Sequence, residues 1–241
     1  PYGSEYSSRK YGYFQSEKDT FLNIAEELDL IRVSDHPVRY ARHPLVYIVE
    51  AADDICYEIM DIEDAHKLKI LDKETTFSLL LSFFDEQKDA GFFRRKEEVF
   101  HEVTDLNERV AYLRASVINK LVNETADIFL AHHDELLKGE FNVSLIDSLQ
   151  GRTRKAFDTC KEVAFGEIYN HRSVVKIELT GFNVLGTLLE EFTYAIMNPH
   201  YNYSDKLLSM MPMQYKPDQN SSIYEKARSV IDFVSGMTDL F

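Results

Sequence analysis

The chain has 241 residues, of which 44% are hydrophobic, and a formal net charge of −14 at pH 7. This acidic balance argues against general binding to nucleic acids or to anionic membranes, because both favour a positive surface. No apolar run approaches the roughly 20 residues that a membrane span requires, and two cysteines make no disulfide framework, so we expect a cytoplasmic protein. Only 9 Gly and 6 Pro interrupt the sequence, which favours long helices and predicts an all-α fold.

The first predicted helix begins at Ser16, a suitable N-cap residue, and continues to about Leu30. A polar connector over residues 33–42 is expected to follow it. The sequence opens at Pro1 on residues typical of a loop within a protein, and we therefore expect it to be part of a longer polypeptide.

A long helix from Pro44 to about Ile70 is the predicted centre of the chain. Proline suits the first turn of a helix, where its missing N–H costs nothing, and no further Pro or Gly occurs before Gly91. Apolar residues recur at helical spacing and predict one buried face, within which Cys56 also falls. The other members of this face are Leu45, Ile48, Ala52, Ile55, Ile59 and Ile62.

The opposite face of this helix is crowded with acidic residues. Asp53, Tyr57 and Asp61 are spaced four residues apart and therefore lie on one face, a turn apart. No Lys or Arg occurs between Arg42 and Lys67, and like charges at this spacing repel, so a metal ion or cations from elsewhere are expected to balance them. Asp53 lies where the two faces meet, and we expect it to be partly buried and functional. The alternative is a solvated acidic face.

The rest of the chain is predicted to be mainly helical. Helices are expected over residues 75–90, ending at Gly91, over 96–123 and 123–137 as one helix or two, over 153–168 and over 222–235.

Two stretches of the C-terminal part are less regular in sequence. Val174 to Ile177 is β-branched and is either a short extended piece or the start of a helix to Phe192, whereas Pro199 to Gln219 is predicted to be irregular. A break at residues 138–142 predicts two domains, which comprise residues 1–145 and 146–241.

Four segments carry a more specific pattern. Glu-Ala-Ala-Asp-Asp-Ile-Cys-Tyr at residues 50–57, followed by Asp-Ile-Glu-Asp-Ala at 61–65, is the most specific of them. The others are residues 10–18, residues 168–172 with 178–181, and residues 235–239. In this order they resemble the dGTP triphosphohydrolase family, a branch of the HD-domain phosphohydrolases, over nearly the whole chain. The resemblance implies the C-terminal part of an HD-type helical bundle over 1–145 and a family-associated helical domain over 146–241.

The resemblance implies that the whole protein hydrolyses dGTP or another deoxynucleoside triphosphate to a deoxynucleoside and triphosphate. HD-type phosphohydrolases hold a divalent cation, expected here to be Mg²⁺ or Mn²⁺, with a His … His-Asp … Asp pattern. Such an ion polarises a phosphoryl oxygen and lowers the pKa of a bound water. Asp53 matches the final Asp of the pattern; a helix cap or a charge pair is the structural alternative. The family's usual state implies a ring-like homo-oligomer, often a hexamer.

Five other residues match positions that contact the nucleotide in the family. The resemblance implies that Tyr57 packs on the deoxyribose and that Asp61 accepts from its 3′-hydroxyl; a core Tyr beside a surface Asp is the alternative. Lys10 matches a Lys that contacts the triphosphate, although a single Lys is usually solvated. Tyr169 and Glu178 match positions used around the base.

His132-His133-Asp134 contains a literal His-Asp pair, but the family order needs that pair before Asp53. Its place near a helix end suits His beside the helix dipole instead. The first His, the His-Asp pair and the catalytic His of the family are therefore missing, so this chain alone is not expected to assemble the metal site. Two alternatives stay open: an HD phosphohydrolase of another nucleotide, and a non-catalytic helical module for oligomerisation or regulation.

Overall fold

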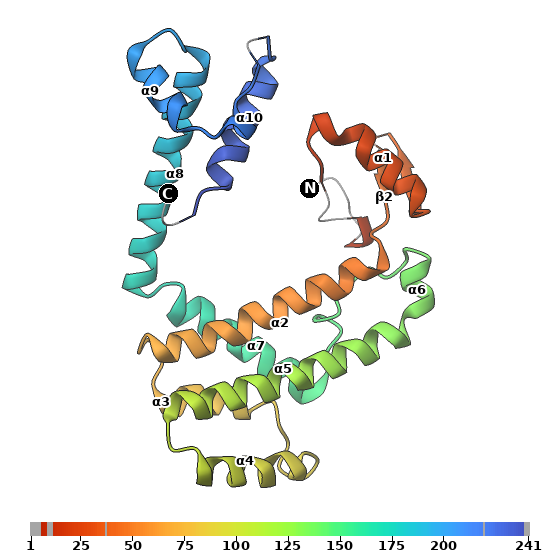
Figure 1. Ribbon diagram of the computed structural model, residues 1–241. Helices are drawn as coiled ribbons and strands as arrows, with labels where there is room; N and C mark the ends of the chain where they lie inside the picture. The colour runs from red at the N-terminus through yellow and green to blue at the C-terminus, as the bar shows by residue number, and fades with distance from the viewer. Residues whose placement is uncertain (1–5, 9–11, 37, 219, 239–241) are drawn as a thin grey trace. The chain divides into compact units, whose positions relative to one another are not determined.

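The computed structural model describes residues 6–8, 12–36, 38–218 and 220–238 and confirms the predicted all-α fold class (Figure 1). The α-helices are α1 (Lys18–Glu27), α2 (Pro44–Lys67), α3 (Lys73–Leu81), α4 (Ala90–Glu102), α5 (Leu106–Ala131), α6 (His133–Leu137), α7 (Gly151–Val163), α8 (Arg172–Met197), α9 (Asn202–Met210) and α10 (Ile223–Ser235). Shorter turns are the 3₁₀ turns η1 (Tyr6–Ser8), η2 (Gln15–Glu17) and η4 (Met213–Tyr215) and the π-helical turn η3 (Ala164–Ile168). None of the described helices combines the length and the apolar character that crossing a membrane requires.

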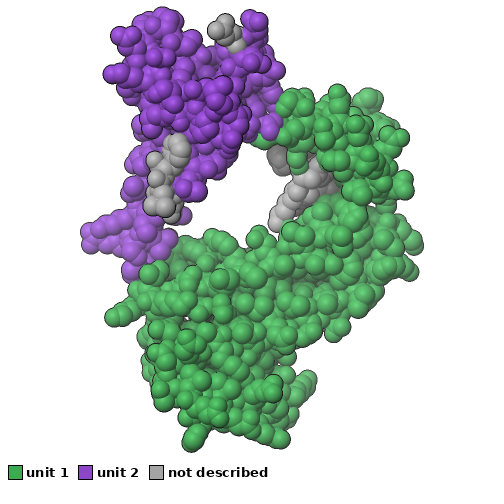
Figure 2. All heavy atoms as spheres, in the orientation of Figure 1, with its two compact units in different colours: residues 1–169 green, residues 170–241 purple. Residues whose placement is uncertain are grey.

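Packing divides the chain into two compact units, residues 1–169 and residues 170–241 (Figure 2). This division does not test the predicted sequence domains, 1–145 and 146–241, which stay a prediction.

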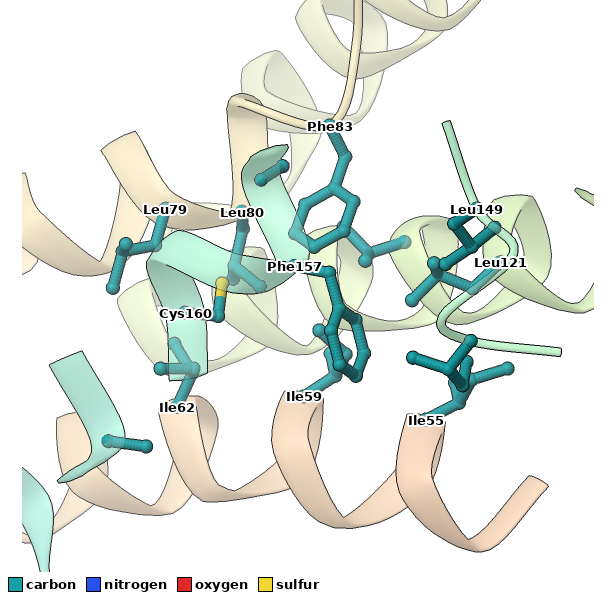
Figure 3. Close-up of a cluster of buried hydrophobic side chains, with 14 of the residues drawn as sticks. Ile55, Ile59, Ile62, Leu79, Leu80, Phe83, Leu121, Leu149, Phe157 and Cys160 are labelled. Atoms are coloured by element: carbon teal, nitrogen blue, oxygen red, sulfur yellow. The ribbon is translucent and has the colours of Figure 1, made fainter. Parts of the chain in front are cut away.

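The core of the first unit forms where α2 packs against α5 and α7. Helix α3 packs against the same helices (Figures 1 and 3). Side chains from these four helices interdigitate in the cluster that Figure 3 shows. Burying each large apolar side chain contributes about 1.5–3 kcal/mol, so this cluster dominates the stability of the unit. Its members include Ile55, Ile59, Ile62, Leu79, Leu80, Phe83, Leu121, Phe157 and Cys160.

The buried face of α2 differs from the predicted one. It follows residues 51, 55, 58, 62 and 65, an alternation of four and three residues that keeps a stripe on one side of a helix. The prediction is confirmed for the three isoleucines at 55, 59 and 62. It was wrong for four residues, because the stripe passes beside them and leaves them exposed: Leu45, Ile48, Ala52 and Cys56.

The segment before α2 is more regular than predicted. Residues predicted to be a polar connector form two antiparallel strands, β1 (Arg32–Asp35) and β2 (Val38–Tyr40), with Arg32 opposite Tyr40 and Asp35 opposite Val38. Helix α1 begins one residue later than predicted, with Glu17 in place of Ser16 at its N-cap.

The helices after α2 break at different residues from those predicted. Gly91 lies in the first turn of α4 instead of ending a helix, and α5 runs without interruption through Asn123. The break between α4 and α5 falls at Val103–Asp105, because the Asp105 carboxylate caps α5 by accepting a hydrogen bond from the Glu108 N–H.

The second unit is a helical hairpin with its own core. Helix α8 includes Val174 to Ile177, so the helical alternative is the correct one, and α9 and η4 occupy much of the stretch predicted to be irregular. Ser222 caps α10 in a capping box with Glu225, in agreement with the predicted start of that helix. The core consists of Phe192, Ile196, Met211, Val230, Phe233 and Val234.

The position of the buried stripe can be tested with two isoleucines of the same helix. Ile59→Ala removes a fully buried side chain and should lower the free energy of unfolding by about 2–5 kcal/mol. Ile48→Ala, on the exposed side of α2, should change it by less than about 1 kcal/mol. Urea denaturation of the two variants measures the difference, and equal losses would contradict this orientation of α2.

Candidate functional site

Helix α2 presents the three predicted residues along one side. His43 caps the helix by accepting the Leu45 N–H on its Nδ1 atom, and Pro44 occupies the first turn. From this start the helix is continuous, so Asp53 and Asp61 stand about 12 Å apart along the axis, with Tyr57 between them. Asp53 and Tyr57 are exposed, and Asp61 is half-buried.

Tyr169 reaches α2 from the end of the first unit. The Tyr169 hydroxyl donates a hydrogen bond of 2.6 Å to Oδ2 of Asp61, a residue 108 positions earlier. The π-helical turn η3 precedes Tyr169, and the Tyr169 N–H closes that turn on the Ala164 carbonyl. Turns of this kind occur often at functional sites, since they shift the register of the side chains that follow.

Aromatic contacts complete the group. The ring centroids of Tyr57 and Tyr169 are 6.4 Å apart with an interplanar angle of 47°, and Phe165 meets Tyr169 edge to face at 5.3 Å. The structure thus brings Tyr57, Asp61 and Tyr169 together, and these three residues are called the tyrosine–aspartate cluster below. Its Asp61 carboxylate and exposed Tyr57 ring suit a ligand with hydroxyl groups and an apolar face.

The cluster changes the acidity of its own members. Burial raises the pKa of Asp61, the hydrogen bond from Tyr169 opposes this shift, and the charge of Asp64 adds to it. Burial and the hydrogen bond to Asp61 together raise the pKa of Tyr169, so its hydroxyl stays a donor at neutral pH.

Glu58 is a residue of this region that the sequence patterns did not single out. Its side chain lies on the buried stripe of α2, only 7% exposed, and its Oε1 atom is enclosed without a hydrogen-bond partner among the described residues. Burial, followed by the charges of Asp61 and Asp54, raises the pKa of Glu58 to about 7. The signal that could have revealed it is its spacing, three residues after Ile55 and four before Ile62.

Cations balance part of the acidic charge of α2, and one of them, Arg114 of α5, comes from elsewhere in the chain as predicted. Glu63 is buried and forms two ion pairs: its Oε2 atom lies 3.0 Å from Nε of Arg114 on α5, and its Oε1 atom lies 3.1 Å from Nζ of Lys67. At the start of the helix, Arg42 pairs with Glu50 at 2.9 Å. Its guanidinium lies 5.0 Å from the ring centroid of Tyr6 and 4.6 Å from that of Tyr47.

Three further predicted site residues are Asp53, Glu178 and Lys10. Asp53 is exposed and not partly buried as predicted, because the buried stripe passes through Ala51 and Ile55 on either side of it. Glu178 is exposed on α8 in the second unit, and Lys10 lies outside the described residues.

No group of three or more His, Cys, Asp or Glu side chains that could hold a metal ion occurs among the described residues. The His-Asp sequence lies on the surface, where His133 Nδ1 is 3.1 Å from Asp134 and His132 Nδ1 is 3.3 Å from Glu135. Asp53 therefore belongs to no such group within the described part of the chain.

Comparison with known proteins identifies relatives for both parts of the chain. Residues 147–241 match the family described as phosphohydrolase-associated domain. A deoxyguanosinetriphosphate triphosphohydrolase-like protein from Synechocystis sp. is 34% identical over 97% of this chain and 50% of its own length. The chain is similar along its whole length to deoxyguanosinetriphosphate triphosphohydrolases.

Other triphosphohydrolase relatives give the same result. A deoxyguanosinetriphosphate triphosphohydrolase-like protein from Pseudomonas aeruginosa is 28% identical over 98% of this chain and 53% of its own length. The deoxyguanosinetriphosphate triphosphohydrolase of Salmonella arizonae is 26% identical over the whole chain and 54% of its own length. The predicted resemblance is confirmed, and the chain spans about half the length of the curated relatives it matches.

The hydrogen bond of the cluster predicts that substitutions at its two tyrosines change the free energy of unfolding by different amounts. Tyr169→Phe removes the donor to half-buried Asp61 and should lower the free energy of unfolding at neutral pH by about 1–3 kcal/mol. Tyr57→Phe, on an exposed side chain, should change it by less than about 0.5 kcal/mol. Chemical denaturation of both variants is the measurement, and an unchanged midpoint for Tyr169→Phe would rule out a stabilising bond.

Proposed function

We propose that the complete protein hydrolyses a deoxynucleoside triphosphate, with dGTP as the first candidate, to a deoxynucleoside and triphosphate. The observation that carries this proposal is the tyrosine–aspartate cluster, which stands one to two helical turns from Asp53 on α2. The names of the relatives support the same reaction. This chain would supply one side of the site.

Asp53 would be the ligand that this chain contributes to a divalent cation, Mg²⁺ or Mn²⁺. An exposed carboxylate fits such an ion, since hard cations prefer oxygen ligands. When bound, the ion would polarise the phosphoryl oxygens and acidify an attacking water. The described residues do not complete the ligand set, so the remaining ligands would come from outside them.

The cluster would bind the sugar of the nucleotide. Tyr57 offers an exposed ring face on which a deoxyribose can pack, and Asp61 can accept a hydrogen bond from a sugar hydroxyl through its Oδ1 atom. Tyr169 occupies Oδ2 and so holds the carboxylate in one orientation. A phosphate beside Asp53 would leave its sugar further along the helix, which is where Tyr57 and Asp61 lie.

Two further contacts belong to the same proposal. Lys10 would meet the triphosphate and Glu178 the base, as their match to the family implies. A ring-like homo-oligomer and a cytoplasmic location stay predictions.

The reaction is tested by replacing Asp53 in the complete protein. Asp53→Ala should lower triphosphate release from dGTP at least about a hundredfold in the presence of Mn²⁺, because it removes a ligand of the proposed ion. Asp64→Ala, which removes an exposed acid of the same helix that faces Lys67, is the matched control and should keep the activity within about twofold.

Two other results would contradict the proposal. Activity that Asp53→Ala leaves unchanged would remove this residue from the mechanism. An inactive complete protein would favour a non-catalytic helical module instead.

A further inference from the structure

Glu58 occupies an unusual position for a carboxyl group. It is more than nine-tenths buried, its Oε1 atom is fully enclosed, and none of the described residues forms a hydrogen bond with that atom. Buried polar groups without partners are rare in folded proteins and call for a specific explanation. By contrast Glu63, five residues further along the same helix and equally buried, is paired with Arg114 and Lys67.

The charged and titratable groups around Glu58 come from three elements. Asp54 and Asp61 lie one turn before and after it on α2, and their negative charges act on it. Lys161 of α7 is the cation that faces it, and the buried thiol of Cys160 lies on the same helix. The charge of Glu58 also contributes to the raised pKa of Tyr169, at the end of η3.

The hydrogen bonds decide which of the neighbouring carboxyl groups can be ionised. Two carboxylates on adjacent turns, both removed from water, cannot easily carry charge together. Asp61 is the better anion, since Tyr169 donates a hydrogen bond to it, whereas no donor among the described residues bonds to Oε1 of Glu58 and only the charge of Lys161 favours its ionised form. The proton should therefore reside on Glu58.

We propose that Glu58 is a positioning residue that stays protonated in the binding form, so that Asp61 carries the only negative charge between them. A single charge leaves Asp61 free to accept both the Tyr169 hydroxyl and a hydroxyl of the ligand. When Glu58 loses its proton, repulsion raises the free energy of the Asp61 carboxylate and weakens the cluster. The role in ligand binding rests on the proposed function; the location of the proton does not.

The direct test is a ¹³C NMR titration of the carboxyl groups in this chain, with Glu58 assigned by its absence in Glu58→Gln. The Glu58 resonance should titrate with a midpoint of about 7, in line with the raised pKa of this carboxyl. Asp61→Asn should lower that midpoint by about one unit, because it removes the neighbouring charge. A midpoint near 4.5, or a midpoint that Asp61→Asn leaves unchanged, would overturn the inference.

Stability gives a second readout with a matched control. An unfolded Glu releases its proton near pH 4.5 and the folded one near pH 7, so folding stability falls as the pH rises between these values and stays low above them. Glu58→Gln has no proton to lose, so its denaturation midpoint should rise relative to wild type across this range. Glu63→Gln breaks a buried ion pair and should lower the midpoint at neutral pH. Loss of stability in both variants at pH 8 would contradict a neutral Glu58.

Kinetics of the complete protein separate this inference from the proposed function. The KM for dGTP of the wild type should rise up to about tenfold from pH 6 to pH 8.5, because a coupling of about one pKa unit between Glu58 and Asp61 corresponds to a factor of ten in binding. The KM of Glu58→Gln should not change over this range. Parallel pH profiles for the two proteins would refute the positioning role while the triphosphohydrolase reaction stands. A wild type that is inactive at every pH would refute the reaction, and the carboxyl titration would still decide where the proton resides.

Discussion

The packing of one face of α2 against α5 and α7 is the constraint on which the candidate site depends. Once Ile55, Ile59 and Ile62 point into the core, the helical repeat fixes the directions of the side chains between them. Asp53 and Tyr57 must point outward, and Glu58 and Asp61 must fall at or inside the border of the core. The chemistry of the helix therefore follows from its hydrophobic contacts.

Burial at this border gives the two carboxyl groups different properties. Asp61 keeps one oxygen bonded to Tyr169, whereas Glu58 is enclosed and no residue in the described part of the chain bonds to its Oε1 atom. The same helix thus holds one carboxyl group suited to accept hydrogen bonds and another suited to hold a proton. The exposed carboxylate of Asp53, further toward the N-terminus, differs from both, since water can reach it and so could a cation. Asp53, Glu58 and Asp61 therefore differ in burial and in hydrogen bonding because they point in different directions around the same helix.

Local sequence signals predicted the elements that depend on local interactions. The run from Pro44 without further Pro or Gly predicted α2, and the last helix was predicted to begin at residue 222, where Ser222 caps α10. The stacking of Tyr57 and Asp61 on one face followed from the helical repeat alone. The all-α class was correct for the same reason.

Features that depend on distant contacts could not be predicted in this way. No local pattern shows that Tyr169 meets Asp61, since 108 residues separate them. Glu58 was not singled out from the sequence, because its burial depends on the packing of α2 against α7. The pairing of β1 with β2 was missed because strands of three or four residues carry little pattern of their own.

The most direct test of the central claim is a crystal structure of the complete protein with Mn²⁺ and a non-hydrolysable dGTP analogue, with anomalous data collected for manganese. We expect a manganese peak within coordination distance of a carboxylate oxygen of Asp53, with the deoxyribose between Tyr57 and Asp61. A manganese ion bound elsewhere, with Asp53 facing bulk water and the sugar away from α2, would contradict it.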